Sequence, residues 1–185
     1  MTRVFSILAG FSITFMAATL VLGMSLGNVS DPADQVTQRW ATVHRLSGVA
    51  AALLVVLVNS IVVTYFIGTS RWCKEVVSIY PIDEVLAERS AKLKRRAFPF
   101  ALLSMLVIVG VVALGGAADP AASLNVPPLG GVTWAQLHLL GSLIGLAMVG
   151  WSFLIERQYV ETNGEIIDRI VEDVRRIRAE RSLDS

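Results

Sequence analysis

The chain has 185 residues, of which 54% are hydrophobic and 17% charged, and its mean hydropathy is +0.63. This composition excludes a disordered protein and a nucleic-acid-binding module, since both classes are much more polar. The formal net charge is only +1, so no acidic polymer is indicated as a partner. The single cysteine, Cys73, excludes an intramolecular disulfide, a cysteine-based zinc site and the covalent attachment of a c-type haem. Two histidines remain as candidate metal ligands.

Four apolar stretches are long enough to cross a bilayer, which takes about 20 helical residues. They comprise residues 4–27, 41–68, 97–116 and 134–154. The first stretch is longer than the apolar region of a signal peptide, so we expect it to be retained as an anchor. Soluble helices need a polar face, and these stretches have almost none. The sequence therefore predicts an all-α membrane protein with a four-helix antiparallel transmembrane bundle in residues 1–156.

The distribution of Lys and Arg predicts the orientation in the membrane. The connection between the second and third stretches and the tail, residues 157–185, are both rich in Lys and Arg, whereas residues 117–132 contain neither. Segments rich in Lys and Arg stay on the cytoplasmic side. We therefore expect both termini in the cytoplasm and the protein in a bacterial inner membrane.

The tail has apolar residues at helical spacing, which are Ile167, Ile170, Val174 and Ile177. Asn163 and Gly164 precede them and predict a break after the fourth span. The pattern indicates a separate amphipathic helix on the cytoplasmic side. We expect it to pack against the 71–96 connection or a neighbouring subunit; the alternative is that it lies on the lipid surface.

Two parts of the chain repeat the same motifs in the same order. The first span ends in Gly27-Asn-Val-Ser-Asp31-Pro32-Ala33, and the third ends in Gly115-Gly-Ala-Ala-Asp119-Pro120-Ala121. Each is followed by Trp-Ala-x-x-His-x-Leu, at residues 40–46 and 134–140. The copies differ in length only in the outer loop, where insertions are tolerated. The sequence therefore predicts two repeated helical hairpins, at about 4–68 and 97–156, related by an axis along the membrane normal.

This repeat places His44 and His138 at one depth, each one turn below an interfacial tryptophan. A single histidine there would be explained by hydrogen bonding at the headgroup level, but two in register favour a functional site. Zinc and copper sites usually take three or four protein ligands, and only loop carboxylates lie near this depth. A haem iron takes two axial ligands from the protein. The pattern therefore favours one haem held by His44 and His138.

Several neighbours of the histidines suit a haem site but have simpler explanations. Gly48, Gly141 and Ser142 would leave space for the macrocycle, although small residues also serve tight helix packing. Arg45 would pair with a haem propionate or be an ordinary interfacial arginine. The apolar cores contain no Asp, Glu or Lys for a proton relay, and no phosphate loop or nucleophile-and-base set indicates an enzyme acting on soluble substrates.

These motifs together resemble one four-helix half of the haem A synthase family, over about residues 4–156. The family has eight spans in two homologous halves, each with a histidine pair suited to a b-type haem. The resemblance implies that its second-helix histidine is His44, the following arginine Arg45, and its fourth-helix histidine His138. The family's glutamate, three residues before the second-helix histidine, is replaced by Ala41, and the repeat has Ala135 there. Haem ligation is therefore expected, and oxidation of haem is not.

The expected function is that of a membrane b-type cytochrome that transfers electrons, alone or as a subunit of a respiratory complex. Expected partners are membrane lipid, other membrane subunits or a second copy in a homodimer, and a quinone or cytochrome; nucleic acid is not expected. The alternative is a haem-free membrane anchor or assembly subunit that docks a partner protein. A haem b difference spectrum of the purified protein distinguishes the two.

Overall fold

The computed structural model describes residues 1–122, 127 and 130–183, and this part of the chain is helical with no strand. Each of the four long helices is long and apolar enough to cross a membrane. This confirms the expected all-helical protein with four candidate membrane spans. The long helices are α1 (Thr2–Met24), α2 (Gln35–Ile79), α3 (Glu84–Ala118) and α4 (Trp134–Leu183), and the short 3-10 helix η1 is Pro120–Ala122.

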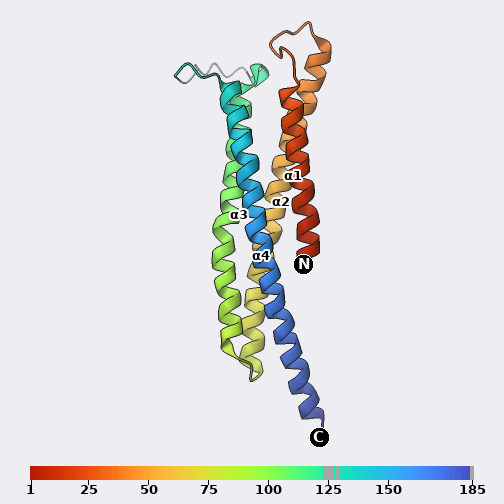
Figure 1. Cartoon of the computed structure of the whole chain (residues 1–185), viewed down its shortest axis with the longest axis vertical. Helices are drawn as coiled ribbons and strands as arrows, with labels where there is room; N and C mark the ends of the chain where they lie inside the picture. Colours follow the sequence, from red (N-terminus) through yellow and green to blue (C-terminus); the bar gives the residue numbers. More distant parts are fainter. Residues whose placement is uncertain (123–126, 128–129, 184–185) are drawn as a thin grey trace.

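The helices lie side by side along one long axis (Figure 1). The α1–α2 connection, the end of α3 and the start of α4 lie at one end of the bundle, and the α2–α3 turn lies near the other. Helices α1 and α3 each pack on both α2 and α4, and α2 also contacts α4 directly. Helices α2, α3 and α4 continue well past the start of α1 and form an extension at that end (Figure 1).

The outward faces of the helices carry large apolar side chains. Leu46, Leu106 and Leu154 are 68%, 61% and 62% exposed, and many other aliphatic residues on all four helices are similarly exposed. A soluble protein rarely exposes contiguous apolar surface on this scale, whereas hydrocarbon accommodates it without cost. The interior holds a second apolar set, which includes Phe5, Val55, Val62, Phe66, Val149 and Phe153. Apolar residues on both the inner and outer faces are consistent with an integral membrane protein.

Aspartates begin the two middle helices. The Asp34 carboxylate accepts hydrogen bonds from the hydroxyl and the backbone N–H of Thr37, at 2.6 and 3.0 Å. The hydroxyl bond holds the pKa of Asp34 below its ordinary value. Asp83 caps α3 in the same way, accepting from the N–H of Val85. Both caps satisfy backbone donors that a helix leaves free in its first turn.

Helix α1 ends at Met24, so the prediction that the first span reaches Gly27 is wrong. Beyond Met24 the chain turns towards the first turn of α2. A Cβ atom on Gly27 would lie 3.0 Å from Oγ1 of Thr37. The loop packs this closely on α2 because Gly27 has no side chain.

The predicted break at Asn163 and Gly164 is also wrong, because α4 is continuous through both residues. Asparagine usually interrupts helices because its side chain competes for backbone hydrogen bonds. Here the buried Asn163 amide donates to the hydroxyls of Tyr65 and Thr69, at 3.1 and 3.0 Å, and its oxygen accepts from the Ser90 hydroxyl at 2.8 Å. These partners on α2 and α3 occupy the side chain, so it ties three helices together and does not end α4.

The tail packs against the 71–96 connection, as the sequence predicted. The connection is itself mostly helical, being the end of α2 and the start of α3. A second apolar cluster joins it to α4; its buried members are Cys73, Val77, Leu86, Ala87, Ile166 and Ile170. Residues 184–185 of the predicted tail, and 123–126 and 128–129 of the predicted outer loop, lie outside the described residues.

Candidate functional site

The structure brings the two histidines together. His44 on α2 and His138 on α4 lie with their ring centroids 6.2 Å apart and their ring planes at 73°. Both side chains are half-buried. The two imidazoles therefore meet across the contact between the second and fourth helices, as their matching positions in the sequence indicate.

Each imidazole is oriented by a backbone carbonyl of the preceding helix. Nδ1 of His44 lies 3.1 Å from the carbonyl oxygen of Thr19, and Nδ1 of His138 lies 3.2 Å from that of Val111. A carbonyl oxygen only accepts, so Nδ1 must carry the proton in both rings. In a neutral imidazole with this tautomer, Nε2 has a free lone pair. A backbone carbonyl on the other ring nitrogen is the usual second contact of a metal-ligating histidine.

Two glycines let the rings lie against the preceding helices. A Cβ atom on Gly23 would lie 2.6 Å from Cε1 of His44, and one on Gly115 would lie 3.0 Å from Cε1 of His138. The sequence comparison aligned Gly27 with Gly115, and the structure corrects this, because Gly23 is the residue that contacts the histidine. The motif match missed Gly23 because α1 ends further from its Asp-Pro dipeptide than α3 does, at Met24 before Asp31 compared with Ala118 before Asp119. The sequence does contain a signal for this contact, because Gly23 is a second glycine one turn before Gly27.

Arg45 has a protein partner that the sequence analysis did not consider. Its Nε–H donates to Oδ2 of Asp119 at 2.9 Å, from side chains that are 37% and 20% exposed. The pair is partly accessible to water, and ion pairs that are accessible to water contribute about 1 kcal/mol or less. The bond uses one of the five N–H donors of the guanidinium, so pairing with a propionate stays a prediction.

The Asp-Pro dipeptides form the same local turn in both loops. Oδ1 of Asp31 accepts from the N–H of Ala33 at 2.9 Å, and Oδ1 of Asp119 accepts from the N–H of Ala121 at 3.0 Å. The repeated letters of the sequence thus correspond to repeated hydrogen bonds.

The small residues near the histidines have different surroundings. A Cβ atom on Gly141 has Cδ1 of Leu114 2.6 Å away, so this glycine serves close packing of α4 on α3. Gly141 also lines an apolar groove of about 490 Å³ between these two helices. Gly48 has no neighbouring atom within 4 Å of an added Cβ, and Ser142 is half-buried. That these three residues border a haem stays a prediction.

Glu156 is a buried acid that the sequence analysis passed over because it follows the predicted fourth span. Its side chain is 0% exposed, and neither carboxylate oxygen has a hydrogen-bond partner among the described residues. A second buried polar side chain is Asn59 on α2, which is 0% exposed. The Asn59 amide nitrogen donates to the carbonyl of Val55, and its oxygen is also unpartnered in this part of the chain.

We expect Glu156→Met to stabilise the fold. Burying a polar group without a hydrogen bond costs about 1–3 kcal/mol in proteins, and methionine has a similar volume without that cost. Thermal unfolding of the purified chain in detergent measures the effect, with the exposed Glu161→Met as the matched control on the same helix. A lower unfolding temperature for Glu156→Met alone would show that the carboxyl has a stabilising partner.

No protein-family model matches the chain, and no similar curated protein or solved structure is found. The resemblance to the haem A synthase family therefore rests on the short motifs.

Proposed function

We propose that the chain is a membrane b-type cytochrome in which His44 and His138 hold one haem b as axial ligands for electron transfer. The observation that carries the proposal is the paired arrangement of the imidazoles, each with Nδ1 on a carbonyl and the rings 6.2 Å apart. With Nδ1 engaged, Nε2 is the nitrogen of each imidazole that would bind the iron, and two imidazoles are protein ligands that suit a haem iron.

We further infer that the bundle consists of two repeated antiparallel hairpins, α1–α2 and α3–α4. Three matched contacts support this inference: the carbonyl bond to each histidine, the glycine beside each ring, and the Asp-Pro turn in each loop. Each hairpin then supplies one imidazole together with the carbonyl that orients it. Such carbonyl contacts fix the ring and increase the basicity of the ligand.

The proposal is limited to electron transfer. A haem with two axial imidazoles supplies one-electron redox chemistry, whereas oxygen activation needs an open coordination position. The position of the family's glutamate is occupied by Ala41, which is buried at 3% exposure and offers no acid. The proposed redox partner is a quinone or a cytochrome, reached within a homodimer or a larger membrane complex.

The test is a reduced-minus-oxidised spectrum of the full chain, purified in mild detergent from a host that makes haem b. We expect the bands of a six-coordinate low-spin b-type haem and a stoichiometry of one haem per chain. Well-folded protein that stays colourless, also after incubation with haem, would overturn the proposal and favour the haem-free anchor.

We also propose that both chain termini lie in the cytoplasm of a bacterial cell, with the protein in the inner membrane. In a Cys73→Ser background, Ser30→Cys should react with an impermeant thiol reagent in intact spheroplasts, because Ser30 is exposed in the α1–α2 loop. Ser182→Cys, exposed near the end of α4, should react only after permeabilisation. The reverse labelling pattern would place the histidines on the cytoplasmic side.

A further inference from the structure

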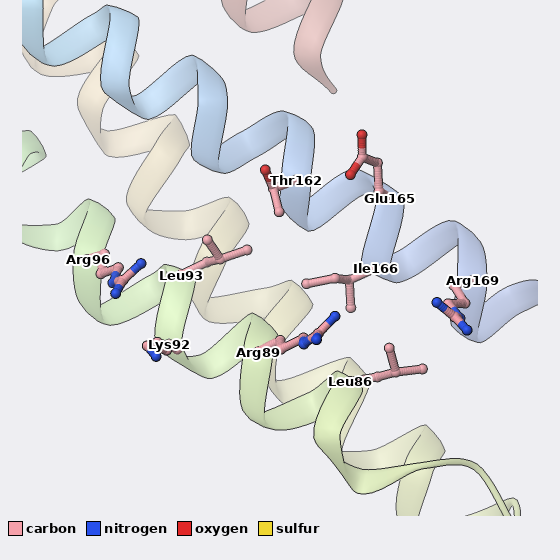
Figure 2. Close-up of a pocket in the computed structure, with 9 residues that line it drawn as sticks. All are labelled: Leu86, Arg89, Lys92, Leu93, Arg96, Thr162, Glu165, Ile166 and Arg169. Atoms are coloured by element: carbon pink, nitrogen blue, oxygen red, sulfur yellow. The ribbon is translucent and has the colours of Figure 1, made fainter.

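The extension at the far end of the bundle carries a basic groove between α3 and α4 (Figure 2). The groove has a volume of about 360 Å³. Four of its lining residues are cations, one is an acid, and the rest are a hydroxyl and three aliphatic side chains. The cations are Arg89, Lys92, Arg96 and Arg169, and the acid is Glu165. The hydroxyl belongs to Thr162, and the aliphatic side chains are Leu86, Leu93 and Ile166.

Three of the cations line the groove together because of their helical spacing. Arg89, Lys92 and Arg96 are spaced at i, i+3 and i+7 and therefore share one face of α3. Arg169 reaches the groove from α4, and Leu93 and Ile166 lie between the helices (Figure 2). The carboxylate of Glu165 points away from the α3 cations in this view.

Among the described residues, no ion pair joins any of these four cations to an acid. The ion pairs found there join Arg45, Arg71 and Arg176 to acids outside the groove. All four groove cations are exposed. Like charges one turn apart repel each other, so an anion bound between them would be stabilised by several cations at once.

We propose that this groove binds a phosphate group. The guanidinium fork of arginine matches phosphate oxygens in a bidentate manner, and three of the four cations are arginines. Arg96 directly precedes the third predicted span, at the level of lipid headgroups, and Arg89 lies about 10 Å further from the hydrocarbon. The phosphate therefore belongs either to an anionic lipid headgroup or to a free phosphate compound in the aqueous phase.

The test compares two double variants of the full-length protein in neutral detergent. Arg89→Gln with Arg96→Gln removes two groove cations, and Lys94→Gln with Arg95→Gln removes two cations of the same segment that do not line the groove. Binding of phosphatidylglycerol is measured by native mass spectrometry, with phosphatidylcholine as the zwitterionic control. Binding of pyrophosphate is measured by calorimetry.

We expect the wild type to bind phosphatidylglycerol, pyrophosphate or both, and the groove pair to lose about tenfold or more in affinity, because two charge-assisted contacts are removed. The Lys94 and Arg95 pair should lose less than about twofold. Binding of phosphatidylglycerol alone identifies a lipid headgroup, and competition between the two probes identifies a general phosphate site. Equal losses in both pairs, or no binding of either probe to the wild type, would overturn the proposal.

Circular dichroism on each variant checks that the helices are intact. Arg89→Lys with Arg96→Lys keeps the charge but removes the planar fork, and should bind between the wild type and the glutamine pair. If the lysine pair keeps its helices but binds no better than the glutamine pair, the geometry of arginine is required, and this result would also support the site.

Discussion

Replacing either His44 or His138 with alanine is expected to abolish the low-spin haem spectrum of the chain. Each substitution removes one axial ligand, so the iron becomes five-coordinate and high-spin, or haem is lost during purification. The two substitutions should have effects of the same kind, because each histidine has the same carbonyl contact. Absorption spectra and the haem content of the purified variants measure the result.

Thr42→Ala is the control for these variants. Thr42 is exposed on α2, close to His44, and its hydroxyl bonds only to the carbonyl of Gln38 among the described residues. This variant should keep the wild-type spectrum. If both histidine variants also keep that spectrum, the iron has other ligands, and the pairing of the imidazoles serves only helix packing.

Alanine at Gly23 is expected to destabilise the chain and weaken haem binding without altering any ligand. The new Cβ would lie 2.6 Å from Cε1 of His44, so the ring or its neighbours must shift, and we expect this shift to weaken the bond to the Thr19 carbonyl. Overpacking of this kind costs about 1–3 kcal/mol. Gly115→Ala should have a smaller effect of the same kind, since its contact with His138 is 3.0 Å.

Neighbouring glycines provide matched controls. Gly10 lies in α1 and Gly116 directly follows Gly115, and neither would have an atom within 4 Å of an added Cβ. Alanine at these two positions should leave haem binding unchanged and stabilise the helices by up to about 1 kcal/mol. Unfolding temperature and haem content are measured together for the four variants. Equal behaviour of Gly23→Ala and Gly10→Ala would contradict the close packing of His44 on α1.

The sequence by itself determined the helical membrane class, because apolar stretches of spanning length without a polar face have few other stable structures. It also singled out His44 and His138, since the Trp-Ala-x-x-His-x-Leu motif occurs twice and contains both histidines of the chain. The packing of the tail on the 71–96 connection followed from the helical spacing of its apolar residues. These are local properties, so periodic and repeated patterns in the sequence indicate them directly.

Only the tertiary structure decided what surrounds these residues. The continuity of α4 depends on partners of Asn163 that lie on α2 and α3, far away in the sequence. The sequence could not indicate that the carbonyls of Thr19 and Val111 contact the histidines, because every residue has a backbone carbonyl. The close approach of Gly23 to His44 depends on where α1 ends, and the burial of Glu156 depends on how the other helices pack around α4. Such contacts join residues distant in the sequence, so the packing of the helices determines them and local patterns do not.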